Sequence, residues 1–230
     1  MDAQTLRALD ALKLARPPVA VAFLSTPPDG VARIDRPAAA GCAYWKHASD
    51  GHAFYTTAED HCECPVGAYT HAVDLPPAVA NELQGLVGTM IELQYLSADE
   101  VSHLPRRLDP LKIATYAPLA NASFSPDLVI FRGNARQIML LAEAARAADA
   151  FAAGVAMGRP ACAAVPEAIN GAAAVASLGC VGNRVYTELA DDELYLMLPG
   201  GAVADTLTRL QTVTAANVEL ERFHRARAAS

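Results

Sequence analysis

Six short apolar runs along the chain have the length and the composition of buried β-strands. They fall into three pairs of similar sequence: PVAVAFL (18–24) with DLVIFRG (127–133), HAFYTTA (52–58) with AAAVASL (172–178), and KIATYAPL (112–119) with ELYLMLPG (193–200). Both members of the last pair reach a proline at their end, and proline cannot donate to a strand ladder. The pattern predicts three strands in each half of the chain.

Other segments have the residue spacing and the end signals of helices. The predicted helices are one from Asn134 to about Ala153, one that starts at Asp74-Leu75-Pro76-Pro77 and runs to about Leu86, a short one after the capping box SADE at 97–100, and one over about 202–226.

The second half of the chain repeats the order of elements found in the first half. CAYWKHASDG (42–51) resembles CAAVPEAING (162–171), and each predicts a short helix that glycine ends. CPVGAYT (64–70) also resembles CVGNRVYT (180–187), with one residue of slip, and both predict cysteine loops that are rich in glycine and small residues. Five paired elements in one order favour a duplication, although alanine-rich sequence also aligns with itself easily.

The pattern predicts a single compact α/β (α+β) domain over residues 1–230, built from two pseudo-twofold related β-α-β-β halves. The first half covers 16–120 and has a helical insertion at 72–111. The second half covers 121–226 and ends in a long helix. No long polar linker separates the two halves, so we expect one unit.

Composition and charge exclude several classes of protein. The 230 residues are 53% hydrophobic and 19% charged, which is typical of a folded globular chain and not of a disordered one. The net charge of -7 and the absence of a basic stripe in the sequence disfavour binding to nucleic acid. No apolar run reaches the roughly 20 residues of a membrane span, and the N-terminal stretch lacks the order of a secretory signal. We expect a cytoplasmic protein without a membrane partner.

The five cysteines carry the most specific chemistry. Their odd number argues against a disulfide scaffold. In a duplicated fold, Cys42 corresponds to Cys162 and Cys64 to Cys180, and a pseudo-twofold axis would bring these four together. Four thiolates suit a [4Fe–4S] cluster or, less well here, a structural zinc, since Cys62 and Cys64 are too close for a zinc knuckle. The alternative for each cysteine is a buried thiol that only packs.

Polar and aromatic side chains near the cysteines complete the candidate site. His61 lies three residues before Cys64, where it is a candidate ligand or proton carrier. Arg184 is suited to a carboxylate or phosphate on a ligand, or to an ion pair with a local acid. The predicted roles are catalytic for His61 and Arg184, cofactor binding for Asn183, Tyr44 and Trp45, and metal binding for Cys42, Cys64, Cys162 and Cys180.

Three motifs are shared with a known family. They are Gly-Cys at the first short helix, Glu-Asp-His before Cys-Pro-x-Gly, and Gly-Cys-x-Gly-Asn-Arg before Tyr-Thr. With them the chain resembles the domain-of-unknown-function family 169 of archaea and bacteria, from about Leu14 to about Arg225. The resemblance implies that Cys62 lies outside the site, and it implies no substrate or reaction. The family positions in this chain are Cys42, His61, Cys64, Cys162, Cys180, Asn183 and Arg184.

The first functional hypothesis is a metal- or iron–sulfur-binding protein of redox or cofactor metabolism, with a small-molecule pocket beside the centre. A metal-free enzyme would instead use Cys64 as a nucleophile and His61 as its base. A haem or corrinoid binder would line its pocket with Tyr44 and Trp45, and His61 would be the axial ligand. The alanine- and leucine-rich helices are compatible with a homodimer as well as with a monomer.

Overall fold

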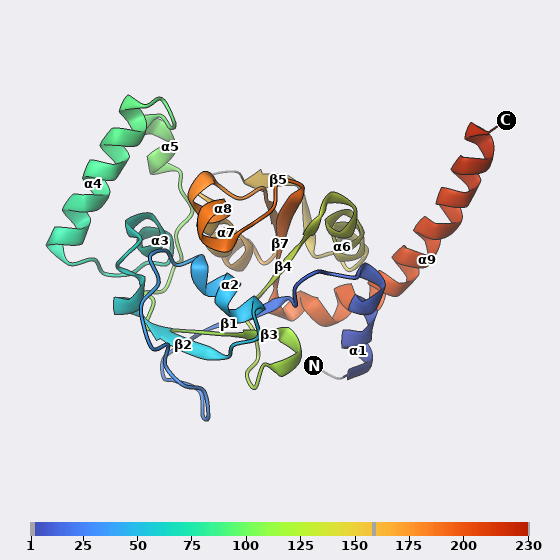
Figure 1. Cartoon of the computed structure of the whole chain (residues 1–230), viewed down its shortest axis with the longest axis horizontal. Helices are drawn as coiled ribbons and strands as arrows, with labels where there is room; N and C mark the ends of the chain where they lie inside the picture. The colour runs from blue at the N-terminus through green and yellow to red at the C-terminus, as the bar shows by residue number, and fades with distance from the viewer. Residues whose placement is uncertain (1–2, 158–159, 230) are drawn as a thin grey trace.

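Figure 1 presents the computed structural model of the chain, which describes residues 3–157 and 160–229. The strands are β1 (Val19–Leu24), β2 (Phe54–Thr57), β3 (Ile113–Pro118), β4 (Leu128–Asn134), β5 (Phe151–Met157), β6 (Ala174–Ser177) and β7 (Glu193–Pro199). The α-helices are α1 (Ala3–Arg7), α2 (Ala43–Ser49), α3 (Pro65–Thr70), α4 (Pro77–Glu92), α5 (Ala98–Ser102), α6 (Ala135–Ala147), α7 (Ala164–Gly171), α8 (Val181–Thr187) and α9 (Val203–Ala228). Short 3-10 helices are η1 (Ala8–Leu12), η2 (Ala58–His61), η3 (Leu119–Asn121), η4 (Ala161–Ala163) and η5 (Gly200–Ala202).

The strands form one sheet in the order β2-β3-β1-β4-β7-β6-β5. The six strands from β2 to β6 in this order are antiparallel to their neighbours. β5 alone pairs in parallel, with β6, and α7 lies between these two strands in the chain. A parallel pair needs such a crossover, whereas antiparallel strands can be joined directly.

The sheet separates two apolar cores because alternate residues of a strand point to opposite faces. On β1, Val19 and Val21 face α2, α3 and α7, whereas Ala20 faces the other core. On β7, Met197 belongs to the first core and Leu198 to the second, which η1, α6 and α9 cover. The result is a helix–sheet–helix arrangement, and all four candidate cysteines lie on the α2–α3 face (Figure 1).

All six predicted strands are confirmed, with small differences at their ends. The predicted helix from Asn134 to Ala153 is confirmed only to Ala147, because Phe151–Met157 forms the edge strand β5. This segment is rich in alanine, which favours a helix in isolation. Its hydrogen-bonding partner β6 is distant in sequence, so local pattern gives no warning of the strand.

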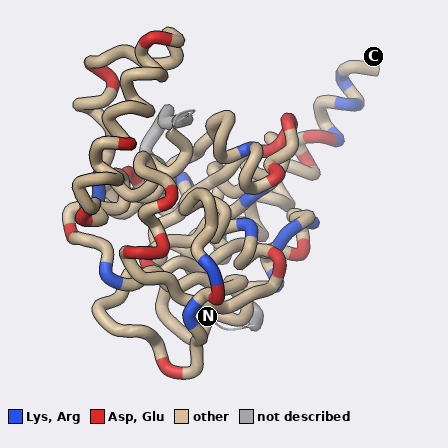
Figure 2. The backbone as a smooth tube through the Cα atoms, turned by 60° about the vertical axis from the view of Figure 1, so that its left-hand side comes forward, with Lys and Arg blue, Asp and Glu red and all other residues tan. Residues whose placement is uncertain are grey.

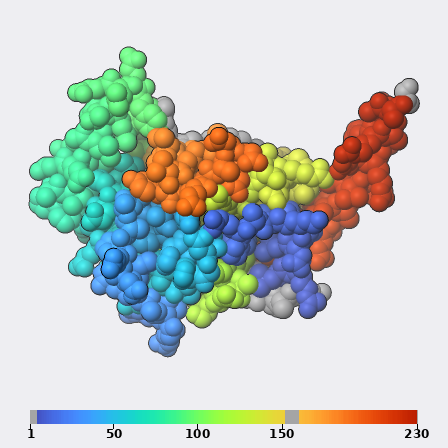
Figure 3. All heavy atoms as spheres, in the orientation of Figure 1, coloured from blue at the N-terminus to red at the C-terminus, as the bar shows by residue number. Residues whose placement is uncertain are grey.

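Two helical arms extend from the body at opposite ends (Figure 3). α4 and α5 form the insertion between the two predicted halves, and neither helix has a buried residue. The capping box at Ser97 is present as predicted. α9 is buried at its beginning, through Val203 and Leu207, while Leu220 and Phe223 near its far end are exposed.

Charge and helix length agree with the coarse expectations. Along the backbone, Lys and Arg are interspersed with Asp and Glu and do not gather into one stripe (Figure 2). Of the helices that the structure describes, none combines the length and the apolar character needed to cross a bilayer.

Candidate functional site

Each of the four candidate cysteines lies at the start of a short helix. Cys42, Cys64 and Cys180 are the N-cap residues of α2, α3 and α8, and Cys162 lies in η4, which leads into α7. The segments after Cys64 and Cys180, which we expected to be glycine-rich loops, are helical instead. Pro65 favours this outcome because proline is well suited to the first position of a helix.

The helices that carry the cysteines contact one another between the two halves of the chain: α2 contacts α8, and α3 contacts η4. Their thiols are neighbours as a result. Burial, with smaller contributions from the thiols of Cys64 and Cys180, raises the pKa of Cys42 to about 12. Burial likewise raises the pKa of Cys162, and the thiols of Cys64, Cys42 and Cys180 add to this shift. Cys42 and Cys162 are therefore uncharged at neutral pH.

The four thiols are not yet a compact ligand set. Among the residues that the structure describes, no three His, Cys, Asp or Glu side chains lie close enough together to hold a metal ion. Burial keeps the thiols of Cys42 and Cys162 uncharged, so no electrostatic attraction draws these two side chains together. A bound cation would remove their protons and supply that attraction, which is how metal binding is coupled to local structure.

Two glycines keep space open beside the thiols. A Cβ on Gly67 would lie 3.3 Å from the Sγ of Cys64, and a Cβ on Gly41 would lie 3.3 Å from the Nδ1 of His61. The backbone N–H of Gly67 donates to Cys64 Sγ over 3.4 Å. A larger side chain at either glycine would therefore press on a candidate donor atom.

His61 is buried, with only 2% of its surface exposed, and its ring lies 5.1 Å from that of Tyr44 and 5.7 Å from that of His71, between centroids. Burial, and then the nearby His71, lower the pKa of His61 to about 3, so the ring is neutral at pH 7. Its Nε2 is 2.8 Å from the hydroxyl of Thr56, whereas its Nδ1 is buried without a hydrogen-bond partner.

A network of polar contacts holds η2, which carries His61. The carboxylate of Asp60 accepts hydrogen bonds from the guanidinium of Arg33 at 3.0 and 3.2 Å and from the backbone N–H of Thr57 at 2.8 Å. Burial alone would raise the pKa of Asp60, but these bonds lower it below its usual value. The hydroxyl of Tyr44 donates to the carbonyl of Asp60 and accepts from the N–H of Ala38. The buried Tyr44 thus holds η2 in place from within the core.

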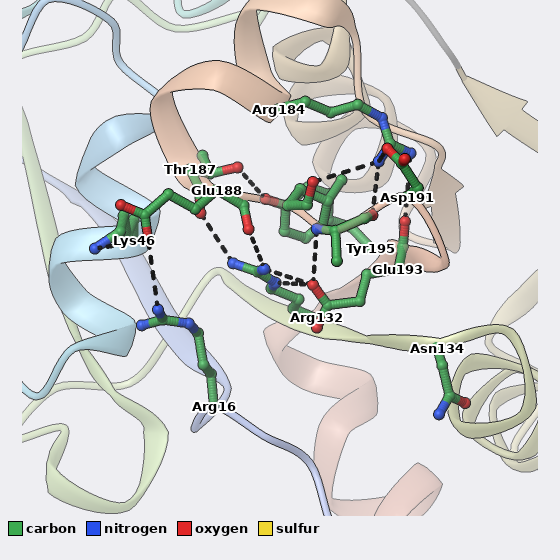
Figure 4. A network of polar contacts seen from close by, with 12 residues as sticks. Arg16, Lys46, Arg132, Asn134, Arg184, Thr187, Glu188, Asp191, Glu193 and Tyr195 are labelled. Carbon is green, nitrogen blue, oxygen red and sulfur yellow. Dashed lines mark hydrogen bonds and ion pairs between the residues drawn. The ribbon is translucent and has the colours of Figure 1, made fainter.

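On the other half, Asn183 lies beside Cys42 and Arg184 points away from it. Asn183 is 2% exposed, and neither atom of its amide makes a hydrogen bond of normal geometry, although the amide is close enough to favour the Cys42 thiolate. Arg184 donates to the carbonyls of Leu178 and Ala190 at 2.6 and 2.7 Å, beside a second network around Arg132 (Figure 4). Asn183 is therefore the member of this pair with unused donors and acceptors.

A family model matches residues 9–209, and its description is DUF169, an uncharacterised ArCR family. The chain belongs to this family. The resemblance inferred from the three motifs is thereby confirmed. No curated protein matches this DUF169 chain, and no solved structure matches it either.

The remaining predicted residues of this family member have simpler surroundings. Trp45 packs edge-to-face on Tyr195, with ring centroids 5.6 Å apart, and lines a pocket with Lys46 and Arg132. Cys62 is half-buried, and its Sγ is 3.7 Å from the carbonyl of Ala58. In sequence, Trp45 follows Cys42 closely and Cys62 precedes Cys64 closely.

Sequence reasoning missed several residues that shape the site. Thr56 contacts His61, and Thr70, at the end of α3, lies close enough to Cys162 to lower the pKa of its thiol against the larger effect of burial. Gly41 and Gly67 stand in the shared motifs, but the motifs do not show that these glycines leave space beside His61 and Cys64. The sequence offered one signal for Gly41, which directly precedes Cys42, but none for the two threonines, whose partners lie elsewhere in the fold.

Proposed function

We propose that this protein binds a metal centre, preferably an iron–sulfur cluster, with Cys42, Cys64, Cys162 and Cys180 as the thiolate donors. A small-molecule ligand would bind beside it, and the reaction is unassigned. One observation carries the proposal: four cysteines from distant parts of the chain stand at the starts of short helices that contact one another, α2 with α8 and α3 with η4. Cys62 remains outside the set.

A duplicated fold would account for this convergence. From the central antiparallel β1–β4 pair, the strand order reads β1-β3-β2 outward to one side and β4-β7-β6 outward to the other, where β5 follows at the edge. Each triplet contains a long first strand, a short outer strand and a third strand that ends at proline. We infer that the halves are duplicates and that the cysteines meet near their pseudo-twofold axis. The contacts of α2 with α8 and of α3 with η4 would then be equivalent.

The surroundings of the thiols favour a cluster over a bare packing role. A buried thiol with no partner is common in a protein core, but a buried amide without hydrogen bonds is uncommon. The amide of Asn183, and the backbone N–H of Gly67 at Cys64, are donors of the kind that stabilise cluster sulfur. Asn183 is therefore the residue that we most expect to contact the cofactor.

The test is an anaerobic purification, followed by a visible spectrum and by counts of iron, zinc and acid-labile sulfide per chain. A brown protein with iron and sulfide in near-equal amounts, about four each for a cubane cluster, would support the proposal. Cys162→Ser should remove the colour, and Cys62→Ser is the matched control that should keep it.

A colourless, metal-free chain that also binds no added iron or zinc would refute the proposal. Thiol labelling would then separate the alternatives. A single fast-reacting Cys64 would support a nucleophile with His61 beside it, and slow labelling of all buried thiols would support packing alone.

A further inference from the structure

We infer that Arg107 binds the anionic group of a small-molecule ligand, a carboxylate or a phosphate. Arg107 follows α5 in the chain and lies beside the end of α3, where its backbone N–H donates to the carbonyl of Thr70 over 2.9 Å. The binding of an anion at Arg107 does not depend on a metal. Only the further statement, that this anion belongs to the ligand beside the metal centre, rests on the proposed function.

An aromatic ring holds the guanidinium of Arg107. The guanidinium lies over Phe23, near the end of β1, with its Cζ atom 3.8 Å from the ring centroid. A guanidinium stacked in this way keeps its N–H groups at the edge of the plane, where they form a rigid fork of donors. The fork is therefore oriented before any ligand binds.

No described group of the protein bonds this fork. The Nη1 of Arg107 is buried and makes no hydrogen bond. Four arginines in the described part of the chain are partly buried, and the other three, Arg16, Arg132 and Arg184, each lie within ion-pair distance of a carboxylate. The chain has 25 Asp and Glu against 18 Lys and Arg, so a shortage of carboxylates does not explain why Arg107 is unpaired.

The nearby acceptors are already bonded to other donors. The Oδ2 of Asp127 accepts from the backbone N–H of Phe23 over 2.7 Å. At the end of α3, the carbonyl of Gly67 accepts from the hydroxyl of Thr70 at 2.9 Å and from the N–H of His71 at 3.0 Å. The fork therefore faces groups whose own hydrogen bonds are complete.

Burial and charge favour an anion at this position. Burial lowers the pKa of Arg107, and the carboxylates of Asp127 and Asp109 act against this shift without forming an ion pair with it. The guanidinium remains charged at neutral pH. A partly buried charge without a hydrogen-bonded partner is costly, and an anion that accepts two parallel N–H bonds removes that cost. Carboxylates and phosphates both have two oxygens at the spacing that the fork requires.

The helix α3 links this fork to the candidate centre. Cys64 is the N-cap of α3 and His71 is its C-cap. Burial lowers the pKa of His71 to about 4, the carbonyl of Gly67 opposes this shift, and the charge of Arg107 adds to it. A helix of six residues is about 9 Å long, at 1.5 Å per residue. The separation is that of the two ends of a small molecule.

The assignment gives Arg107 a role that the sequence suggested for Arg184. Arg184 already donates to two backbone carbonyls, at 2.6 and 2.7 Å. The neighbouring Arg106 is exposed and lies over Tyr69, with its Cζ 5.4 Å from the ring centroid. Arg106 thus has the same charge and an aromatic neighbour, but water can bond its donors, which makes it a matched control.

The test is an NMR titration of the anaerobically purified chain with inorganic phosphate and, separately, with acetate, at constant ionic strength. The reporters are the Nε–H of Arg107, assigned by its absence in Arg107→Lys, and the backbone N–H of residue 107. We expect both to shift and saturate as one site. Arg107→Met should weaken the binding of the tighter anion at least about tenfold, because charge-assisted hydrogen bonds are lost. Arg106→Met should change it by less than about threefold.

The outcomes separate the anion site from the metal centre. Tighter binding of phosphate would assign a phosphate group, and tighter binding of acetate would assign a carboxylate. No saturable shift with either anion, or equal losses in Arg107→Met and Arg106→Met, would overturn the site. The Nε–H shift is measured on the unchanged chain, so it decides the question even if Arg107→Met fails to fold.

Iron and sulfide are counted on the same samples. A chain without iron that shows the saturable shift would refute the centre and leave the anion site standing. A chain with iron and no shift would refute the site alone.

Discussion

The helices α3 and α8, which the proposed duplication pairs, each begin at a cysteine and have six and seven residues, yet they differ in what surrounds them. α3 is embedded, with Gly67, Ala68 and Thr70 buried. α8 lies at the surface and exposes 67% of Val181 and 69% of Val185. Two short helices of similar sequence therefore contribute differently to the fold: α3 packs into the core, and α8 covers it from outside.

The two helices are also held in different ways. The turn before α3 is fixed from within the core, by Tyr44 and by the bonds between Arg33 and Asp60. The end of α8 is fixed from the sheet, where Arg132 donates to the carbonyl of Thr187 at 2.9 Å and to the carboxylate of Glu193 (Figure 4). The two helices therefore keep their positions through different partners.

The largest effect should come from the two N-cap cysteines of α3 and α8. Cys64→Ser and Cys180→Ser should each remove most of the iron and acid-labile sulfide from the anaerobically purified protein, because each variant lacks one thiolate donor of the proposed centre. Counts of iron and sulfide per chain measure both variants. A loss in Cys64→Ser but not in Cys180→Ser would contradict a centre shared by the two helices.

A smaller effect, on stability, should follow when the hydrogen bond to His61 is removed and its ring is kept. Thr56→Val retains the shape of the side chain but deletes the hydroxyl, so the free energy of unfolding should fall by about 1–3 kcal/mol, because the buried Nε2 of His61 loses its partner. Thr115→Val is the control, since Thr115 is also fully buried and its hydroxyl has no hydrogen-bond partner. If the two variants unfold at the same urea concentration, Thr56 does not hold the ring.

The anchor of α8 should affect stability and not metal affinity. Burial raises the pKa of Glu193, but bonds from Arg132 and from the N–H of Ala190 lower it below its usual 4.5. A carboxyl with a lowered folded pKa contributes stability above its unfolded pKa and loses it as the pH falls through the folded value. Arg132→Met should therefore cost about 2 kcal/mol at pH 7, and the difference from the unchanged protein should shrink below pH 4.

Urea unfolding at several pH values measures this difference. The exposed Arg136, which pairs with Glu221 on α9, provides the control: Arg136→Met should leave the unfolding midpoint within error. If the loss of stability in Arg132→Met did not depend on pH, the contacts of Arg132 with the carbonyls, and not with Glu193, would be what anchors α8.

Much of the fold could be predicted because the central strands are buried on both faces. Such strands appear as continuous apolar runs, as at Leu128–Asn134 and Glu193–Pro199. The edge strand β5 could not be predicted, since its alanines favour a helix and only pairing with the distant β6 makes it a strand. In α9 the apolar spacing continues to Phe223, but spacing defines a face and does not say whether anything covers it.

For the candidate site, the sequence indicated which residues have the chemistry of a site, but it did not indicate which residues hold them in place. The cysteines and His61 could be selected because few side chains have their chemistry. The part played by Thr56 depends on β3, whose carbonyl at Ala114 takes the hydroxyl proton. That pairing joins residues 58 positions apart, so no local pattern contains it.

The smallest effect should come from the outer face of α8. Val185→Thr should change the free energy of unfolding by less than about 0.5 kcal/mol, as is usual for exposed positions. On α3 the buried Ala68→Val should cost about 1–3 kcal/mol, because the added methyl groups have no room. Urea unfolding of both variants tests the contrast. If Val185→Thr were as costly as Ala68→Val, α8 would be covered in solution, and the contrast between a buried α3 and an exposed α8 would fail.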